Sequence, residues 1–521
     1  MKVFFQKYSL PLSIIVFSLV SNFGLGYLVS VYTLAMFFFW YGLFLFNKKI
    51  FSILFLINLI VCVLFAPIAY LYGRINIGLI ASLFETNLHE STEFINLITW
   101  QAWATGLLVL ISGFGVIYIG RYTNKNYSLQ RHKYIVIVFF SIFLLFSLHK
   151  PTTNTLKRHQ PFNLVNTEVG NINFYFRIFQ AVEQYYDERI QSEQILSNKP
   201  VWEIIGSHPK YKNYVLVIGE SMRADYMSLY GFPIDTTPYL RRSNGLVIDE
   251  FIAPAPNTQT SLTRMLHLTQ GNIISYPNNL ISLAKAAGFK TYWLSTQPTS
   301  DDADTAAARV GIQADYSHFY DPNSSRDGKN SISDFILLEG VAEQLKQMKN
   351  AHNSLFVLHI NGSHPDFCKR LIQPVSERFK SEKMSCYLET LKQTDQLLQR
   401  LEVEMKSYGS YSIMYLSDHG LAHIDKNTDH VSLLNSTKDK QAYHVPFIKI
   451  SSDDTKQVHL KVRRSGFDFI YAFSEWLGID EKKLKLPYRF FSEDKVDSVK
   501  IFNWEGVIPY ETLHDDPALQ P

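Results

Sequence analysis

The sequence predicts an α-helical transmembrane domain of about five helices, followed by an α/β domain with a mostly parallel central sheet. Apolar residues are concentrated in roughly the first 150 positions. From about Tyr211 onward, short β-branched runs alternate with longer amphipathic stretches. A chain of 521 residues is also long for one folding unit. We therefore expect a helical domain over residues 1–150, a linker with an interfacial helix over 151–210, and the α/β domain over 211–521.

Two transmembrane spans are predicted within Leu10–Asn47, where no charged residue occurs. The run is too long for one span of about 20 residues and fits two that join near Ser21–Gly24. A cleaved signal peptide over Met1–Ser21 is the alternative, and further apolar stretches downstream argue against it. Those stretches predict three more spans: Phe51–Tyr72, Thr99–Ile119 and Tyr134–Leu148.

Basic residues orient these spans. They precede the first span and occupy alternate links: Lys2, Lys7, Lys48, Lys49, Arg121, Lys125, Arg131 and Lys133. The link Gly73–Ile98 instead holds one arginine and several acids: Arg74, Glu85, Glu90 and Glu93. The positive-inside rule predicts a cytoplasmic N-terminus and places the chain after Lys150 outside. Aromatic and charged residues mix at helical spacing over Phe174–Leu196, which predicts an interfacial helix or, alternatively, a solvated connecting helix.

In the second half, apolar runs and amphipathic stretches alternate along the chain. The predicted strands are Tyr214–Ile218, Lys290–Leu294, Leu355–Ile360, Ser412–Leu416 and Val445–Ile450. The predicted helices are Asn279–Ala287, Ile332–Lys349, Cys386–Ser407 and Phe467–Leu477. This order favours a mostly parallel sheet, in which functional groups gather beyond the carboxyl ends of strands.

Residue types that bind metals lie at the ends of three predicted strands or in the loops just after them. They are Glu220, His359, His364, Asp418, His419 and His430. Carboxylates and imidazoles together suit zinc or manganese better than magnesium or calcium. Taken singly, Glu220 fits a helix N-terminus, Asp418 a turn cap and His359 a buried core position. Their occurrence at separate strand ends predicts a metal site.

A hydroxyl that a metal could activate is predicted at Thr258. Prolines precede it, and the run after Asn257 has the pattern of a helix start. A nearby metal would lower the pKa of that hydroxyl and make it nucleophilic. A simple helix N-cap is the alternative role for Thr258.

These motifs resemble the alkaline phosphatase and sulfatase superfamily, and within it the membrane-bound phosphoethanolamine transferases. The resemblance is carried by GESMRADYMSLYGFPIDTTPYL, by His-x-x-Gly-x-His and by Asp-His-Gly. It implies that Glu220, Asp418 and His419 bind zinc and that the nucleophile is the fourth ligand of the same ion. Alignment on Ser261-Leu262 and Met265 places that nucleophile at Thr258, with Thr260 as the alternative. The remaining histidines, which are His359, His364 and His430, resemble those that bind the phosphoryl group or a second zinc.

The resemblance also implies a function, which we state as an expectation. The protein would transfer phosphoethanolamine from phosphatidylethanolamine, through a phosphothreonine, to a lipopolysaccharide acceptor such as core heptose, Kdo or lipid A. It would be a multi-pass protein of the bacterial inner membrane with a periplasmic catalytic domain and one or two zinc ions, manganese being possible instead. The alternatives are a phosphoglycerol transferase, a phospholipid-cleaving hydrolase, and a non-catalytic lipid-binding protein on the same scaffold. A net charge of +3 with no dense basic stripe gives no indication of a nucleic-acid partner.

The three cysteines show no spacing typical of a thiolate metal site. Cys62 lies in an apolar run and is expected to be buried. Cys368 and Cys386 either pair in an oxidising compartment or stay as free thiols.

Overall fold

The computed structural model describes residues 2–85, 91–92, 94–95, 98–122, 129–193, 198–271, 273–297, 305–320, 332–348 and 352–521. Internal contacts divide the chain into two compact units. The first, the helical unit, holds Met1–Phe84 and Ser91–Tyr186. The second, the α/β unit, consists chiefly of Asp187–Pro521. The division falls inside one helix, α8, and the predicted domain limits at 150 and 210 stay predictions.

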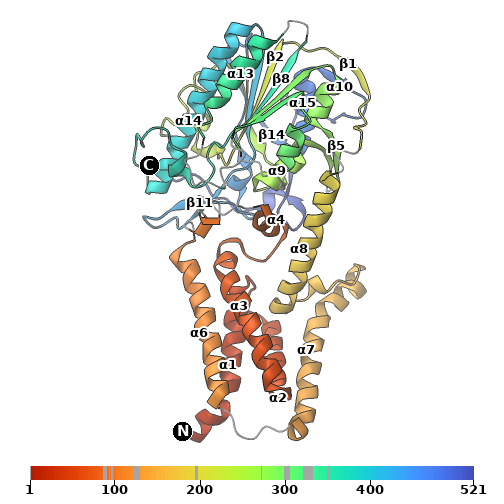
Figure 1. Cartoon of the computed structure of the whole chain (residues 1–521), viewed down its shortest axis with the longest axis vertical. Coiled ribbons are helices and arrows are strands. Elements are labelled where there is room, and N and C mark those ends of the chain that lie inside the picture. The colour runs from red at the N-terminus through yellow and green to blue at the C-terminus, as the bar shows by residue number, and fades with distance from the viewer. Residues whose placement is uncertain are drawn as a thin grey trace. The chain divides into compact units, whose positions relative to one another are not determined.

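The helical unit contains every one of the predicted spans as helix (Figure 1). Its helices are α1 (Lys2–Gly24), α2 (Leu34–Phe46), α3 (Lys48–Tyr72), α4 (Ile77–Glu85), α6 (Trp100–Tyr122), α7 (Leu129–Arg158) and α8 (Gly170–Glu193). Among the described residues, three stretches are long and apolar enough to cross a membrane: Lys48–Tyr72, Trp100–Arg121 and Lys133–Arg158. Two shorter apolar helices cover Tyr8–Gly24 and Val31–Phe46. Because α1 continues through Ser21–Gly24, the link to the next helix lies after the predicted tetrapeptide.

Helix α8 covers most of the predicted interfacial helix. Buried amides fix its first turns to α3 and to the link that follows α1. Asn171 donates to Oδ1 of Asn58 at 3.0 Å, and Asn173 Oδ1 accepts from the Tyr27 hydroxyl at 2.6 Å. The last residues of the predicted segment, 194–196, lie outside the described residues, as do Glu90, Glu93 and Lys125 of the charge argument.

A nine-stranded mixed sheet forms the centre of the α/β unit, in the order β12-β3-β13-β9-β2-β8-β6-β7, with β14 paired to β3. The strands are β2 (Asn213–Gly219), β3 (Gly245–Ile252), β6 (Lys290–Ser295), β7 (Tyr316–Phe319), β8 (Ser354–His359), β9 (Tyr411–Ser417), β12 (His444–Val445), β13 (Phe447–Ser451) and β14 (Gln457–Ser465). Strands β7, β6, β8, β2 and β9 run parallel, so their carboxyl ends share one edge. Strands β2, β8 and β9 are buried along their whole length, which is typical of strands covered on both faces.

Helices cover both faces of this sheet (Figure 1). Helices α13 (Ile336–Gln347) and α14 (Glu382–Met405) pack on one face. On the other lie α9 (Thr258–Met265), α10 (Leu280–Ala286), α11 (Ala306–Gly311) and α15 (Phe469–Leu477). Four two-stranded sheets complete the unit: β1 (Ile204–Ser207) with β15 (Ile479–Glu481), β4 (His267–Gln270) with β5 (Ile273–Asn279), β10 (Ala422–Ile424) with β11 (Ser432–Leu434), and β16 (Lys500–Phe502) with β17 (Val507–Pro509).

The last predicted strand, Val445–Ile450, differs from its prediction. It is broken at Pro446 into β12 and β13, because proline has no N–H for the ladder. Strand β13 pairs antiparallel with β9, so the parallel region ends at β9. Strands β3 and β14, which pair parallel with each other, were not among the predicted strands.

The cysteine alternatives are resolved by the structure. Cys368 and Cys386 form a disulfide, which closes the loop between β8 and helix α14 onto that helix. Cys62 is free and buried in α3, as expected.

Candidate active site

Strand β2 delivers Glu220 to the carboxyl edge of the sheet. The next residue, Ser221, has φ of 56°, a left-handed conformation that is costly for a non-glycine residue. Several bonds hold this turn. The backbone N–H of Ser221 donates to Asp418 Oδ1 at 3.0 Å, and its hydroxyl donates to Glu220 Oε1 at 2.7 Å. Tyr387 of α14 donates to the Ser221 carbonyl at 3.1 Å. The turn that positions Glu220 is therefore held by Asp418, after β9, and by α14.

Strand β9, the parallel neighbour of β2, delivers Asp418 and His419. His419 Nδ1 lies 2.7 Å from the Gly420 carbonyl oxygen, which can only accept, so this nitrogen carries the proton. Nε2 therefore faces the carboxylates, 3.3 Å from Glu220 Oε1 and 3.4 Å from Asp418 Oδ2. A histidine whose far nitrogen is held by a carbonyl is oriented in the way metal-binding histidines usually are.

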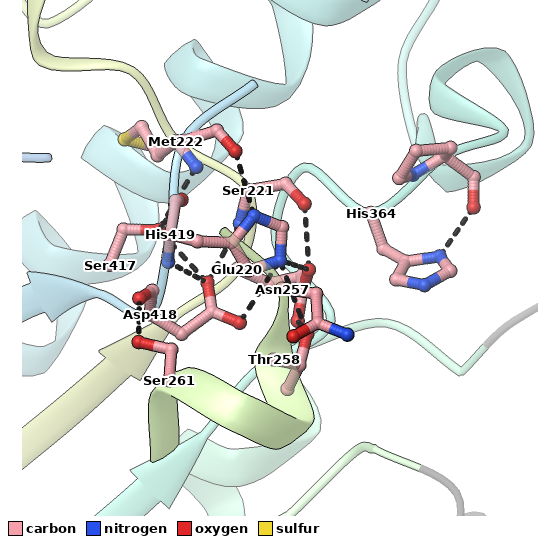
Figure 2. Close-up of polar contacts among 12 residues, drawn as sticks. Glu220, Ser221, Met222, Asn257, Thr258, Ser261, His364, Ser417, Asp418 and His419 are labelled. Atoms are coloured by element: carbon pink, nitrogen blue, oxygen red, sulfur yellow. Dashed lines mark hydrogen bonds and ion pairs between the residues drawn. The ribbon is translucent and has the colours of Figure 1, made fainter. Parts of the chain in front are cut away.

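Helix α9 brings Thr258 to the same point, as Figure 2 shows. Asn257 caps the helix by accepting from Thr260 N, so Thr258 is the first helical residue rather than the cap. The Thr258 hydroxyl lies 3.0 Å from Glu220 Oε2 and 3.3 Å from His419 Nε2. Ser261, one turn later, donates to the Asp418 carbonyl at 2.5 Å and fixes the helix against the end of β9.

The residues of this cluster fit a metal ion. One ligand atom each from Glu220, Asp418 and His419 lies within 4.8 Å of the others, and each residue is at most 2% exposed. Asp418 Oδ2 is buried and has no hydrogen-bond donor among the described residues. Buried carboxylates are costly unless they are paired or bind a cation, and two of them lie here. A mixed carboxylate and imidazole set suits zinc or manganese.

Electrostatic coupling in the cluster is strong. Burial favours the neutral form of Glu220, but the hydrogen bond and charge of His419 outweigh it and hold the glutamate pKa well below its usual range. Burial and the charge of Glu220 raise the pKa of Asp418 to about 7. Although burial opposes it, the two carboxylates raise the pKa of His419 to about 9. A centre that favours positive charge between two acids is what a cation site requires.

The other predicted site residues, which are His359, His364, His430 and Thr260, are not ligands of this cluster. His364 stands apart in Figure 2, in the loop after β8, with its ring against the Pro365 carbonyl. His359 is buried at the end of β8, its pKa is lowered to about 4 by burial, and its Nε2 has no partner among the described residues. His430 is exposed in the loop between β10 and β11, outside the cluster. Thr260, the alternative nucleophile, contacts Asn257 and Trp504 instead.

Gln297 is a site residue that the sequence analysis did not identify. It follows β6, and its amide donates to Glu220 Oε2 at 3.2 Å and to the Ile360 carbonyl at 3.0 Å. The glutamate is therefore held from two strands away. The rule that functional groups follow parallel strands would have found it, since Gln297 comes shortly after a predicted strand.

Comparison with known proteins agrees with this geometry. The sulfatase family profile matches residues 212–479. Phosphoethanolamine transferase OpgE of Escherichia coli K12 is 33% identical over 494 residues, which are 94% of this chain and 92% of that protein. Phosphoethanolamine transferase EptC of the same strain is 22% identical over 428 residues, 75% of this chain and 72% of that protein.

Two solved structures share the fold. The integral membrane lipooligosaccharide phosphoethanolamine transferase A (EptA) of Neisseria meningitidis has a TM-score of 0.59 at 18% identity, over 92% of this chain and 97% of its own. The C-terminal periplasmic domain of EptC from Escherichia coli, solved as a complex with Zn, has a TM-score of 0.52 at 22% identity. It covers 60% of this chain and 97% of its own.

Proposed function

This chain belongs to the membrane-bound phosphoethanolamine transferases of the alkaline phosphatase and sulfatase superfamily, and from that premise we propose its reaction. It transfers phosphoethanolamine from phosphatidylethanolamine to a lipopolysaccharide acceptor, which is a core heptose, Kdo or lipid A. Transfer proceeds through a phosphothreonine at Thr258. The observation that carries this proposal is the Thr258 hydroxyl within 3.3 Å of both a buried carboxylate and a buried imidazole.

Glu220, Asp418 and His419 are the proposed ligands of a zinc ion, with manganese as the second choice. The fit of the donor set, the orphaned Asp418 Oδ2 and the zinc complex of the related EptC domain support this assignment. When bound, such an ion supplies positive charge that lowers the pKa of the threonine hydroxyl and stabilises negative charge on the phosphoryl oxygens.

In the first half-reaction the Thr258 oxygen bonds to phosphorus and the bond from phosphorus to the diacylglycerol oxygen breaks. The hydrogen bond to Glu220 Oε2 holds the threonine oxygen in place, the hydroxyl proton passes to solvent, and the departing diacylglycerol oxygen takes a proton from solvent. Gln297 and Ser221 keep the glutamate in place during this step. In the second half-reaction an acceptor hydroxyl replaces the threonine oxygen, which regains a proton.

Three histidines are the proposed phosphoryl-binding groups. His364 is accessible in the loop beyond β8, whereas His359 presents an unpartnered buried nitrogen. His430 is the least supported of the three, because it would have to approach from an exposed loop.

The proposed location is the bacterial inner membrane, with the N-terminus in the cytoplasm, about five passes and a periplasmic α/β unit. Apolar helices long enough to cross a bilayer support the membrane part. The basic residues that occupy alternate links support the orientation.

The reaction is tested with phosphatidylethanolamine labelled in its headgroup. We expect diacylglycerol release, a phosphoethanolamine adduct on Thr258, and the same mass gained by one envelope glycolipid in cells. Label gained only from phosphatidylglycerol would identify a phosphoglycerol transferase, and free phosphoethanolamine alone a hydrolase. Absence of turnover with metal bound would identify a non-catalytic lipid-binding protein.

A further inference from the structure

A second cluster of buried charges lies next to the candidate active site, and the proposed reaction does not use it. Its centre is Asp516, an acid that follows β17 and is only 4% exposed. Its charged and titratable partners are Arg223, His423 and Lys426. Because a buried carboxylate is costly unless it is paired, the contacts of Asp516 show what this residue holds together.

The first partner, Arg223, comes three residues after Glu220 and is fully buried. Its Nη1 donates to Asp516 Oδ2 at 3.0 Å, and its Nη2 donates to the Asp516 carbonyl at 2.6 Å. The backbone N–H of Arg223 donates to the Tyr387 hydroxyl at 2.9 Å, and the same hydroxyl donates to the Ser221 carbonyl. Asp516 therefore anchors the end of the turn that presents Glu220.

The second partner, His423, comes four residues after His419. Its backbone N–H and its ring Nδ1 each lie 2.9 Å from Asp516 Oδ2. Burial lowers the pKa of His423, so the ring is neutral, with the proton on Nδ1 and with Nε2 accepting from the Tyr226 hydroxyl at 2.6 Å. Asp516 therefore also anchors β10, the strand that follows the segment carrying Asp418 and His419.

A third contact runs through Gln441. The backbone N–H of Asp516 donates to Gln441 Oε1 at 2.7 Å. A Cβ on Gly420 would collide with the Gln441 carbonyl oxygen and would lie 3.4 Å from Arg223 Cγ. Gly420, the residue directly after His419, is therefore enclosed by two residues that Asp516 binds.

Asp516 is ionised in this cluster. Burial favours the neutral carboxyl group, but the hydrogen bond from His423 and the charge of Arg223 outweigh it and hold the pKa of Asp516 well below its usual range. Lys426 pairs with the other oxygen, Oδ1. Removing this charge would leave the buried Arg223 with Asp225 as its remaining acid, and breaking a buried ion pair is costly because the other charge stays behind.

We infer that Asp516 is a positioning residue for the metal centre, because it binds the segment after Glu220 and the segment after His419 to each other and so sets the spacing of these ligands. The inference rests on the proposed function, which takes Glu220, Asp418 and His419 as the ligands. Groups that orient metal ligands typically contribute about 10- to 100-fold to metal affinity.

A purely structural role for Asp516 predicts a different result. Loss of a stabilising ion pair would lower Tm of the metal-free protein but would leave the arrangement of the ligands around a bound metal unchanged. A positioning role changes that arrangement even when the metal site is saturated.

The test uses the full-length, detergent-solubilised protein. Zinc affinity is measured by competition with a chromophoric chelator, and the visible absorption spectrum is recorded with Co²⁺ in place of zinc. Asp516→Asn removes the charge at nearly constant size, and Asp497→Asn makes the same change at an exposed position. We expect zinc binding to weaken by about 10- to 100-fold in Asp516→Asn, with shifted cobalt bands at saturation, and neither change in the control. Parental zinc affinity and a parental cobalt spectrum in Asp516→Asn, whatever its Tm, would overturn the inference.

A second pair of variants decides the question if Asp516→Asn does not fold. His423→Asn keeps an N–H donor near the position of Nδ1, whereas His423→Leu has none. We expect zinc binding to be several-fold weaker in His423→Leu than in His423→Asn. Equal zinc affinities of the two variants would overturn the inference.

Failure of this inference can be distinguished from failure of the proposed function. If the parental protein binds no zinc, the metal centre of the proposed function falls, and the positioning role falls with it. If the parental protein binds zinc and Asp516→Asn binds it equally well, only the positioning role is overturned.

Discussion

The hydroxyl oxygen of Thr258 lies 3.0 Å from Oε2 of Glu220, although the two residues are 38 positions apart. One belongs to the first turn of α9 and the other follows β2. Asn257 caps α9 from the position just before Thr258, and Ser261 anchors the helix to the end of β9. Together these bonds bring the hydroxyl to the glutamate. Among the described residues, Thr258 is the only residue of α9 whose side chain reaches the buried carboxylates. It therefore lies where the proposed nucleophile is needed.

Replacement of Thr258 by alanine should abolish both adduct formation and transfer, because no oxygen remains to attack phosphorus. Zinc content, measured by elemental mass spectrometry, should stay near that of the parental protein, since the three proposed ligands remain. Thr260→Val is the matched control and should still form the adduct. Normal turnover by Thr258→Ala would remove the nucleophile assignment.

Asp418→Asn should release the metal. The change replaces one of the two buried carboxylates by a neutral amide. It does so at an oxygen, Oδ2, that accepts no hydrogen bond from the described residues. Bound zinc should fall well below one ion per chain, and a chelator should lower Tm for the parental protein but not for the variant. Asp429→Asn, in an exposed loop, is the control and should behave like the parent. Retained zinc in Asp418→Asn would contradict the ligand set.

Gln297→Ala should weaken metal binding or turnover by about 10- to 100-fold, the usual effect of losing a group that orients a metal ligand. The amide donates to Glu220 and to the Ile360 carbonyl, so its effect is expected to pass through the glutamate. Gln297→Glu should be worse, because it puts a second negative charge against Glu220. The measurements are zinc affinity by competition with a chromophoric chelator and adduct formation rate. Equal values for glutamine and alanine would show that the hydrogen bond orients nothing.

His267→Asn should make the protein less sensitive to acid. Burial lowers the pKa of His267 to about 4 from its ordinary 6.5, so the histidine stays neutral when folded. Its contribution to stability is complete above pH 6.5 and is lost as pH falls toward 4, at about 1.4 kcal/mol per pH unit. Asparagine keeps a donor for the Thr263 carbonyl without a titratable group. Tm measured from pH 7.5 to 4.5 should fall less steeply in the variant, and parallel curves would contradict this account.

Replacing both Cys368 and Cys386 by serine should lower the stability of the α/β unit by about 3 kcal/mol, the value expected for a loop of 18 residues. Reduction of the parental protein by dithiothreitol should reproduce the fall in Tm. The double variant should be insensitive to the reductant. A parental Tm unchanged by reduction would show that the bond does not constrain the unfolded chain.

Local pattern was sufficient for much of the fold. Hydropathy alone located α1, α2, α3, α6 and α7 of the first unit, because a membrane helix must be apolar over its own length. Runs of β-branched residues located β2, β6, β8 and β9, which are buried on both faces and so carry continuous apolar sequence. Strand β3 escaped detection since Asp249 and Glu250 interrupt its apolar run.

The candidate site could be predicted from the sequence only in part. Residue types after parallel strands identified Glu220, Asp418 and His419, because the carboxyl ends of such strands share an edge whatever their order. The same reasoning included His430, which the structure leaves exposed, and omitted Gln297. A residue's type does not reveal which way its loop turns.

The sequence by itself determined the five apolar helices α1, α2, α3, α6 and α7, the buried strands β2, β6, β8 and β9, and the chemical groups that follow those strands. These are properties of neighbouring residues, set by side-chain period and composition. Tertiary structure alone decided that β9 lies beside β2, that Asn257 rather than Thr258 caps α9, and that Cys368 meets Cys386. Contacts between distant segments depend on how strands order and side chains pack, and no local pattern records that.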